Sequence, residues 1–245
     1  MKIGIMQPYF FPYLGYISLI KHTDEFMLFD PVQFIRHGWI ERNRILKPTE
    51  GWQYIAVPLM KHSQETKIQD IKIDNNQQWR EKIFAQLQHY KKKAPFYAQT
   101  IDVINAGLSQ MTDSITQLNF NTLKATCEYL NIPFNCSIFS ERHLDIEPVN
   151  APDEWALNIC KALKYAEYWN PPGGQEFFDA SKYENAGIKL VFQKPKLEFY
   201  SQRRGPNNFE PGLSIIDVMM FNSVTDINNM LDKYELIIPQ NDKGR

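Results

Sequence analysis

The chain has 245 residues, of which 43% are hydrophobic and 22% are charged. These fractions are close to the average for globular proteins, so a largely disordered chain is excluded. Its 27 Lys and Arg residues nearly balance its 28 Asp and Glu residues, leaving a net charge of −1. Such a chain has no global positive field that would hold nucleic acid or an anionic membrane. Aromatic residues reach 13%, and their rings suit recognition surfaces as well as cores.

No part of the sequence is typical of export, membrane insertion or metal binding. The N-terminus lacks the long apolar segment of a secretory signal, and no run approaches 18 apolar residues. The three cysteines, Cys127, Cys136 and Cys160, are irregularly spaced, which argues against a disulfide framework. The five histidines form no metal-binding motif, so no metal site is predicted. We expect a cytoplasmic protein.

The first thirty residues predict a strand, a helix and a second strand. Residues 2–6 form a short apolar run, and Pro8 and Pro12 prevent its continuation as a central strand. Residues 14–21 have the apolar spacing of a short helix, and residues 25–29 read as another buried strand. This order is typical of a βαβ unit, so the two strands are expected to pair in parallel.

The rest of the chain alternates predicted helices and strands. Helices are predicted over residues 79–90, 96–106, 114–130, 153–163, 215–221 and 226–231, with Ser114, Asp153 and Ser214 as caps. Strands are predicted over residues 53–59, 67–73, 134–139, 165–169 and 188–192. The alternation predicts an α/β, Rossmann-like fold with a parallel sheet, as a single domain over residues 1–245. Residues 75–132 predict a helical lobe inserted in that domain or appended to it.

The densest polar and aromatic segment, residues 7–16, follows the first predicted strand. The carboxyl edge of a parallel sheet is where α/β proteins bind ligands, which makes Gln7, Tyr9, Tyr13 and Gly15 candidate site residues. The alternative is that the loop aromatics belong to the core.

Within this loop, Tyr13-Leu14-Gly15-Tyr16 occupies the place of a known phosphate-binding signature. It resembles the His-x-Gly-His motif of nucleotidyltransferases of the HUP superfamily, with both histidines replaced by tyrosines. A tyrosine can donate a hydrogen bond to a phosphate but cannot offer an imidazolium. The resemblance implies a HUP-like fold for the N-terminal half more than it implies adenylyl transfer.

A second polar segment follows the second predicted strand and is expected at the same sheet edge. Its candidate side chains are Asp30, Gln33, Trp39, Arg42, Asn43 and Arg44. The two arginines offer planar guanidinium groups for a carboxylate or a phosphate. The alternative is that they pair with nearby acids such as Glu41.

Two later segments contain further candidates. Gly173 and Gly174 could let the backbone approach a ligand closely, with Asp179 shortly after them, although an ordinary tight turn explains the glycines equally well. Asp217 lies on an otherwise apolar helix face. It is either a site residue or a buried acid whose hydrogen bonds hold a loop.

Together these segments resemble the WbqC-like family of bacterial proteins. The most distinctive match is Met6-Gln7-Pro8-Tyr9-Phe10-Phe11-Pro12-Tyr13-Leu14-Gly15-Tyr16. The other matching stretches are residues 29–34, 39 with 42–45, 93–97, 173–174 with 178–179, 187–188, 213–217 and 221–222. The sequence departs from the family at Pro31 and Glu41, where an acid and an asparagine are usual, which predicts a different substrate if those side chains bind it.

The resemblance implies a role in bacterial surface-polysaccharide (O-antigen) synthesis. The implied reaction is amide formation, in which an aminoacyl group such as glycyl, or an acyl group, is moved onto the amine of a nucleotide-linked amino sugar. The donor would be a thioester on a carrier protein or an adenylate made from ATP, and no resident cofactor is predicted.

The candidate residues divide into two roles under this hypothesis. Asp30 would accept a proton from the attacking ammonium, while Gln7, Gln33 and Asn43 would orient the acyl carbonyl. Binding would fall to the rings of Tyr9, Tyr13 and Trp39, to Arg42 or Arg44, and to Gly173, Gly174, Asp179 and Asp217. One alternative is a HUP-like nucleotidyltransferase or ATP-dependent ligase, with Tyr13, Gly15 and Tyr16 near the phosphates. Another is a non-catalytic binding protein of the same pathway.

Overall fold

The computed structural model describes residues 1–202 and 209–239. Its centre is a six-stranded sheet in the order β5-β2-β1-β6-β7-β8. The strands are β1 (Lys2–Met6), β2 (Glu25–Leu28), β5 (Cys136–Ile138), β6 (Glu167–Asn170), β7 (Lys189–Pro195) and β8 (Tyr234–Ile237). The first five strands of that order run parallel, and β8 runs antiparallel to β7. The sheet confirms the predicted α/β, Rossmann-like fold.

The opening strand–helix–strand unit is as expected. Helix α1 (Leu14–His22) connects β1 to β2, which pair in parallel with Gly4 opposite Phe26. A Cβ added at Gly4 would lie 2.8 Å from the Phe26 ring, so glycine is required where that ring crosses β1.

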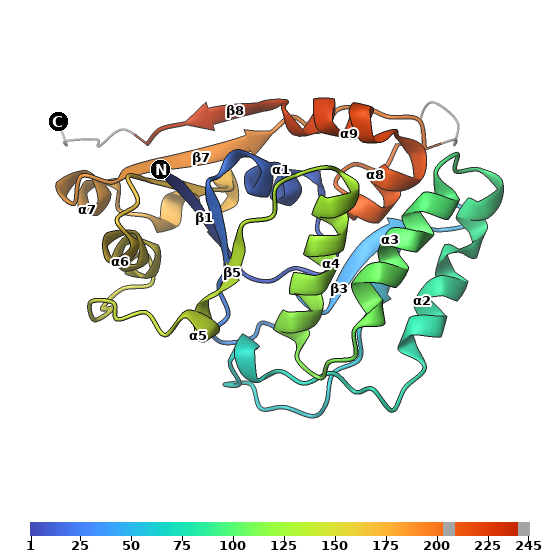
Figure 1. Cartoon of the computed structure of the whole chain (residues 1–245), viewed down its shortest axis with the longest axis horizontal. Helices are drawn as coiled ribbons and strands as arrows, with labels where there is room; N and C mark the ends of the chain where they lie inside the picture. The colour runs from blue at the N-terminus through green and yellow to red at the C-terminus, as the bar shows by residue number, and fades with distance from the viewer. Residues whose placement is uncertain (203–208, 240–245) are drawn as a thin grey trace.

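Two hydrophobic clusters cover the two faces of the sheet, because successive side chains of a strand point to opposite faces. Phe26 and Leu28 of β2 pack into the first cluster with α1, whereas Met27 between them packs into the second. The second cluster also receives α6 (Glu154–Leu163) and α7 (Ala180–Asn185). The sheet is therefore doubly wound, with α1 on one face and α7 on the other (Figure 1).

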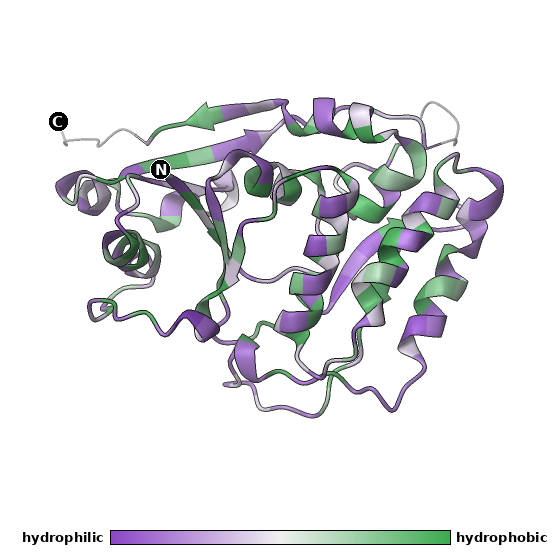
Figure 2. Ribbon diagram, viewed as in Figure 1, coloured by the Kyte–Doolittle hydropathy of each residue, from purple (hydrophilic) through white to green (hydrophobic). Residues whose placement is uncertain are grey.

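The predicted helical lobe packs on the same face as α1. It consists of α2 (Trp79–Leu87), the 3₁₀ helix η2 (Gln88–Lys92), α3 (Tyr97–Ser109) and α4 (Ile115–Tyr129). Hydrophobic and hydrophilic segments alternate along α2, α3 and α4 in Figure 2, as amphipathic helices require. The apolar residues of the lobe belong to the first cluster, so the lobe shares its core with the sheet.

An antiparallel hairpin lies beside the lobe and carries part of the pocket described below. It pairs β3 (Arg42–Leu46) with β4 (Trp52–Ala56), and Arg44 lies opposite Tyr54.

Of the remaining elements, the last two helices were predicted and the other three elements were not. The remaining elements are η1 (Ile68–Asp70), α5 (Phe139–Arg142), η3 (Pro172–Phe177), α8 (Ile215–Phe221) and α9 (Val224–Leu231). The strand predicted over residues 67–73 is wrong: the chain there forms η1 and makes only isolated bridges.

Two of the three predicted helix caps are confirmed. Ser114 Oγ accepts from the Gln117 amide at 3.3 Å, and Ser214 Oγ accepts from the Ile216 amide at 3.2 Å. The cap predicted at Asp153 is wrong, because its carboxylate instead accepts from Lys182 Nζ at 3.1 Å and from the Asp179 amide. Within residues 1–202 and 209–239, no helix combines the length and apolarity needed to cross a bilayer.

Candidate functional site

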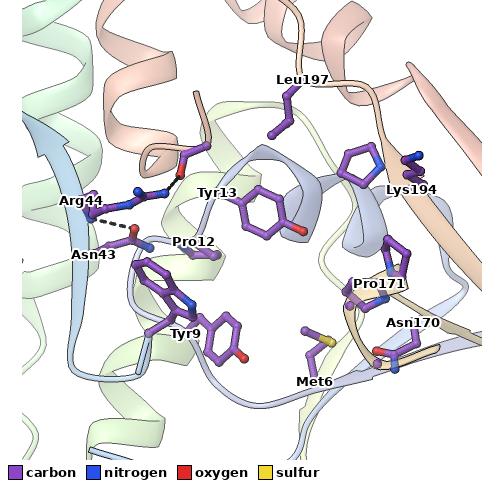
Figure 3. Close-up of a pocket in the computed structure, with 16 residues that line it drawn as sticks. Met6, Tyr9, Pro12, Tyr13, Asn43, Arg44, Asn170, Pro171, Lys194 and Leu197 are labelled. Atoms are coloured by element: carbon purple, nitrogen blue, oxygen red, sulfur yellow. Dashed lines mark hydrogen bonds between the residues drawn. The ribbon is translucent and has the colours of Figure 1, made fainter. Parts of the chain in front are cut away.

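A pocket of about 690 Å³ opens at the carboxyl ends of β1, β6 and β7 (Figure 3). It is lined by Met6, Tyr9, Pro12, Tyr13, Trp39, Asn43, Arg44, Asn170, Pro171, Pro172, Gly173, Gly174, Lys194, Pro195, Leu197 and Gly212. Its volume lies in the range of pockets that enclose a small organic ligand.

The strand order explains why the pocket forms at this place. From β1 the chain winds through α1 to β2 on one side, while β6 lies on the other side of β1 and leads through α7 to β7. The loops that follow β1 and β6 therefore diverge to opposite faces. This is the topological switch point at which doubly wound α/β proteins bind their ligands.

The loop after β1 is held by hydrogen bonds to most of its carbonyl groups. Asn119 Nδ2 donates to Pro8 O at 2.8 Å, and Asn43 Nδ2 donates to both Phe10 O and Phe11 O at 3.0 Å. Ser214 Oγ donates to Phe11 O at 2.6 Å. Phe11 has a positive φ of 38°, a conformation that persists in a non-glycine residue only when its surroundings enforce it. The loop is therefore preorganised.

The side chains of this loop divide between the core and the pocket. Phe10 and Phe11 are fully buried, so the core interpretation is correct for these two rings. Tyr9 and Tyr13 line the pocket, and their hydroxyl groups point into the space between its walls (Figure 3). Burial raises the pKa of both phenols, with a further rise at Tyr13 from the neighbouring Tyr9. Both hydroxyls therefore keep their protons at neutral pH and can donate hydrogen bonds.

Arg44 and Trp39 form the wall opposite β6. The Arg44 guanidinium lies 5.4 Å from the Trp39 ring centroid and 5.1 Å from that of Trp52, and Nη2 donates to Gly212 O at 3.1 Å. Trp39 is 37% exposed at the pocket edge. The placement of Tyr9, Tyr13, Trp39 and Arg44 in one cavity agrees with the sequence-based prediction.

Arg42, two residues earlier on β3, lies outside this pocket. Its guanidinium stacks on Tyr54 at 4.0 Å and donates to the carbonyls of His37 and Gly38. The two arginines share a face of β3, since they are two residues apart, but they contact different partners along the strand. Of the two, Arg44 is the one available to a ligand.

The pocket is electropositive. Lys194 joins Arg44 among its lining residues, and the described lining residues include no carboxylate and no histidine. In residues 1–202 and 209–239, neither cation lies within ion-pair distance of an acidic side chain. Such a cavity favours an anionic ligand.

Asp30 does not line the pocket, although it was predicted to be the proton acceptor. It is 1% exposed, and its carboxylate accepts from the amide and the hydroxyl of Ser140 at 3.1 and 2.7 Å. Burial raises the pKa of this carboxyl, and the bonds from Ser140 oppose that rise. These contacts give Asp30 a structural role, fastening the end of β2 to α5.

The three predicted amide groups are also engaged elsewhere. Gln33 Nε2 donates to Gln64 O at 2.7 Å, outside the pocket, and Gln7 is absent from its lining. Asn43 does line the pocket, but its Nδ2 supports the carbonyls of Phe10 and Phe11. Its Oδ1 accepts from the Arg44 amide at 2.8 Å. Asn43 is therefore a support of the loop.

Gly15 and Tyr16, the second half of the His-x-Gly-His-like stretch, are buried and do not line the cavity. Tyr16 is fully buried and its hydroxyl donates to Gln7 O at 2.8 Å. Gly15 lies beneath the Tyr13 ring. Only Tyr13 of this stretch lines the pocket.

The later candidates separate in the same way. Gly173 and Gly174 line the pocket as the start of η3 after β6. Asp179 caps α7 by accepting from the Ser181 amide at 2.9 Å. Asp217 is fully buried and accepts from the hydroxyls of Tyr90 and Tyr200 at 2.7 and 2.6 Å. Neither acid reaches the cavity, and Asp217 is the buried acid of the alternative interpretation.

Several lining residues were not predicted from the sequence. They are Met6, Pro12, Asn170, Pro171, Pro172, Lys194, Pro195, Leu197 and Gly212. Asn170 and Lys194 follow predicted parallel strands, so position alone could have identified them. Gly212 precedes the candidate Asp217 in the same segment, and Leu197 comes from a segment with no local signal of binding.

Comparison with known proteins matches the same stretches of sequence. The model of the WbqC-like protein family matches residues 7–229. The chain belongs to this family. A relative, the "Uncharacterized protein Rv1507c" of Mycobacterium tuberculosis, is 29% identical over 221 residues, which cover 89% of this chain and 92% of the relative. No solved structure matches the chain. The family match begins directly after β1 and includes the loop that follows it and strands β6 and β7 of the pocket edge.

Proposed function

We propose that this member of the family is a cytoplasmic amide-forming transferase of surface-polysaccharide synthesis. It binds a nucleotide-linked amino sugar in the switch-point pocket and moves an acyl or aminoacyl group, such as glycyl, onto the sugar amine. The observation that carries the proposal is the pocket itself. It combines aromatic rings with a guanidinium that has no carboxylate partner among the described residues, at a topological switch point. The link to polysaccharide synthesis rests on the family resemblance.

The chemistry required of the pocket is nucleophilic acyl transfer. The neutral amine attacks the carbonyl carbon of an acyl thioester or acyl adenylate, an N–C bond forms, and the C–S or C–O bond breaks. The leaving thiolate or phosphate departs with the electron pair and takes the proton released by nitrogen. This assignment avoids a protein carboxylate as proton acceptor, which the described lining residues do not supply.

The two tyrosines suit the stabilisation of the oxyanion in this reaction. Tyr9 and Tyr13 point their hydroxyls into the cavity, and burial keeps both protonated because it raises the pKa of each phenol. A hydroxyl positioned in advance costs little reorganisation when charge develops on the carbonyl oxygen. The two tyrosines thus take the role that the sequence assigns to Gln7, Gln33 and Asn43, which is to orient the acyl carbonyl. Trp39 offers a ring on which the base or sugar can stack.

The direct test is product formation. The protein is incubated with a uridine- or thymidine-diphosphate-linked amino sugar and either a glycyl thioester of N-acetylcysteamine or glycine with ATP, and the amide is sought by mass spectrometry. We expect Tyr13→Phe to lower kcat by about 100-fold. The matched control is Tyr54→Phe, a tyrosine stacked on Arg42 outside the pocket, and it should leave the rate unchanged. An equal loss in both variants would contradict the assignment.

A second candidate is a HUP-like ATP-dependent ligase, which the strand order around β1 also supports. It predicts exchange of pyrophosphate into ATP in the presence of glycine, whereas a transferase that uses a carrier thioester predicts none. A non-catalytic binding protein predicts nucleotide-sugar binding with no product from either donor. These assays separate the three functions.

A further inference from the structure

The usual phosphate position of a doubly wound fold is covered in this protein. In such folds the phosphates lie at the N-terminus of the helix that follows β1, here α1. A Cβ built on Gly15 would lie 2.5 Å from the Tyr13 ring and 2.7 Å from Cγ of Pro195. Leu14, Gly15 and Tyr16 are buried. The ring of Tyr13 and the ring of Pro195 therefore close over the first turn of α1, and a phosphate needs another anchor.

Arg44 has the properties of such an anchor. Its guanidinium is fixed between the indoles of Trp39 and Trp52, and Nη2 is held by the Gly212 carbonyl. Its Nε is buried and has no hydrogen-bond partner among the described residues. A planar guanidinium offers a pair of parallel N–H donors to a phosphate, and stacking on aromatic rings orients it before the ligand arrives.

Two other arginines show how a structural guanidinium can be satisfied here, whereas Arg80, outside the pocket, also keeps a buried Nη2 with no partner among the described residues. Arg142 Nη1 lies 2.7 Å from Glu25 Oε1, and Arg42 donates to two backbone carbonyls. Within the described residues Arg44 has a single carbonyl acceptor and no carboxylate, although it lines the cavity described above. Because Arg44 lines the pocket, an anion that enters it would complete the contacts of this guanidinium.

We infer that Arg44 is the phosphate anchor of the pocket and that the ligand is a nucleoside diphosphate. Its phosphates then lie against the β3 hairpin instead of at the N-terminus of α1. A diphosphate fits better than a lone carboxylate, because Lys194 supplies a second cation and Tyr9 and Trp39 offer rings for the base within about 690 Å³. This inference rests on the proposed function only in sharing its pocket.

Isothermal titration calorimetry on the full chain tests the anchor directly. The probes are UDP, ADP and dTDP, with uridine and glycine as ligands that lack a phosphate. We expect a diphosphate to bind, and Arg44→Met to weaken it roughly 10- to 100-fold, the range of charged hydrogen bonds. Binding of uridine should not change. Arg42→Met is the matched control from the same strand and should bind the diphosphate as the unaltered protein does.

Arg44→Lys guards against a folding defect, since it keeps the charge and loses the planar fork. We expect it to bind more weakly than the unaltered protein and more tightly than Arg44→Met. Absence of binding by all three diphosphates, unchanged binding in Arg44→Met, or equal loss in Arg42→Met would overturn the inference. Diphosphate binding that depends on Arg44 without amide formation would overturn the proposed transferase and leave the anchor standing. Amide formation by Arg44→Met with an unchanged KM for the nucleotide-linked sugar would overturn the phosphate anchor and leave the proposed transferase standing.

Discussion

Among single residues, the predicted acids hold the fold outside the pocket, while aromatic rings and two cations line the cavity. Sequence position alone predicted that Tyr9, Tyr13, Trp39 and Arg44 lie together, because residues that follow parallel strands meet at the carboxyl edge of the sheet. All four line the pocket. Sequence position could not show that Asp30 turns to Ser140, since that contact joins residues 110 positions apart. Long-range partners of buried acids have no local signature.

Asp30 provides a pH-dependent test of its structural role. Its pKa is raised by burial above the ordinary value of 3.8, so its contribution to stability is largest at low pH and is lost as the pH rises through the raised value. We expect the difference in the free energy of unfolding between the unaltered protein and Asp30→Asn to decrease as the pH rises from about 4 to about 7. Urea unfolding at both values measures this difference. A constant difference would contradict the assignment, as would loss of diphosphate binding in a folded Asp30→Asn variant.

At the scale of elements, the five parallel strands and β4 were predicted from the sequence, whereas β3 and β8 were not. Each of the parallel strands, β1, β2, β5, β6 and β7, overlaps a run of mostly apolar residues in the sequence. Strand β3 (Arg42–Leu46) has three polar residues, and its position depends on pairing with β4, which sequence periodicity does not reveal. Since β3 carries both Asn43 and Arg44, half of the polar wall of the pocket depended on an element that was not predicted.

The loop after β1 depends on supports from other elements, which gives a second prediction. Asn119 on α4 does not line the pocket, yet its Nδ2 donates to Pro8 O and to Ile40 O at 2.8 and 2.9 Å. We expect Asn119→Ala to cost about 2–3 kcal/mol, because it leaves buried carbonyls without donors. Diphosphate affinity should fall as well, as Pro8 and Ile40 lead into the segments that carry Tyr9 and Trp39. Asn121→Ala on the same helix is the control, and an equal effect on affinity there would contradict the interpretation.

A third prediction concerns the contact between α6 and α7. Glu154 accepts from Lys182 at 2.8 Å and from the Asn150 and Ala151 amides, and these bonds lower its pKa from 4.5 to about 2. A carboxylate with a lowered pKa stabilises the folded protein at pH values above its ordinary pKa of 4.5. That stability is lost as the pH falls toward the lowered pKa of about 2. Glu154→Gln should therefore destabilise the protein at pH 6, with a smaller effect at pH 3. Thermal unfolding at both values measures it, and a larger effect at pH 3 would contradict the assignment.

For the whole molecule, the order of strands determines where the pocket lies. The chain winds from β1 to opposite faces of the sheet and leaves a gap beside β1, and the β3–β4 hairpin adds a further wall to that gap. The α/β class and the helical lobe were predictable from alternation and amphipathic spacing. The position of the hairpin against the sheet edge was not, because it depends on the shared core of lobe and sheet.

The most direct measurement is a crystal structure with a uridine- or thymidine-diphosphate-linked amino sugar. The predicted result is diphosphate density against Arg44, with the ligand's rings near Tyr9 and Trp39 and the sugar amine facing the Tyr9 and Tyr13 hydroxyls. Density at the first turn of α1 would contradict the phosphate anchor. Density away from the switch-point pocket would contradict the site itself.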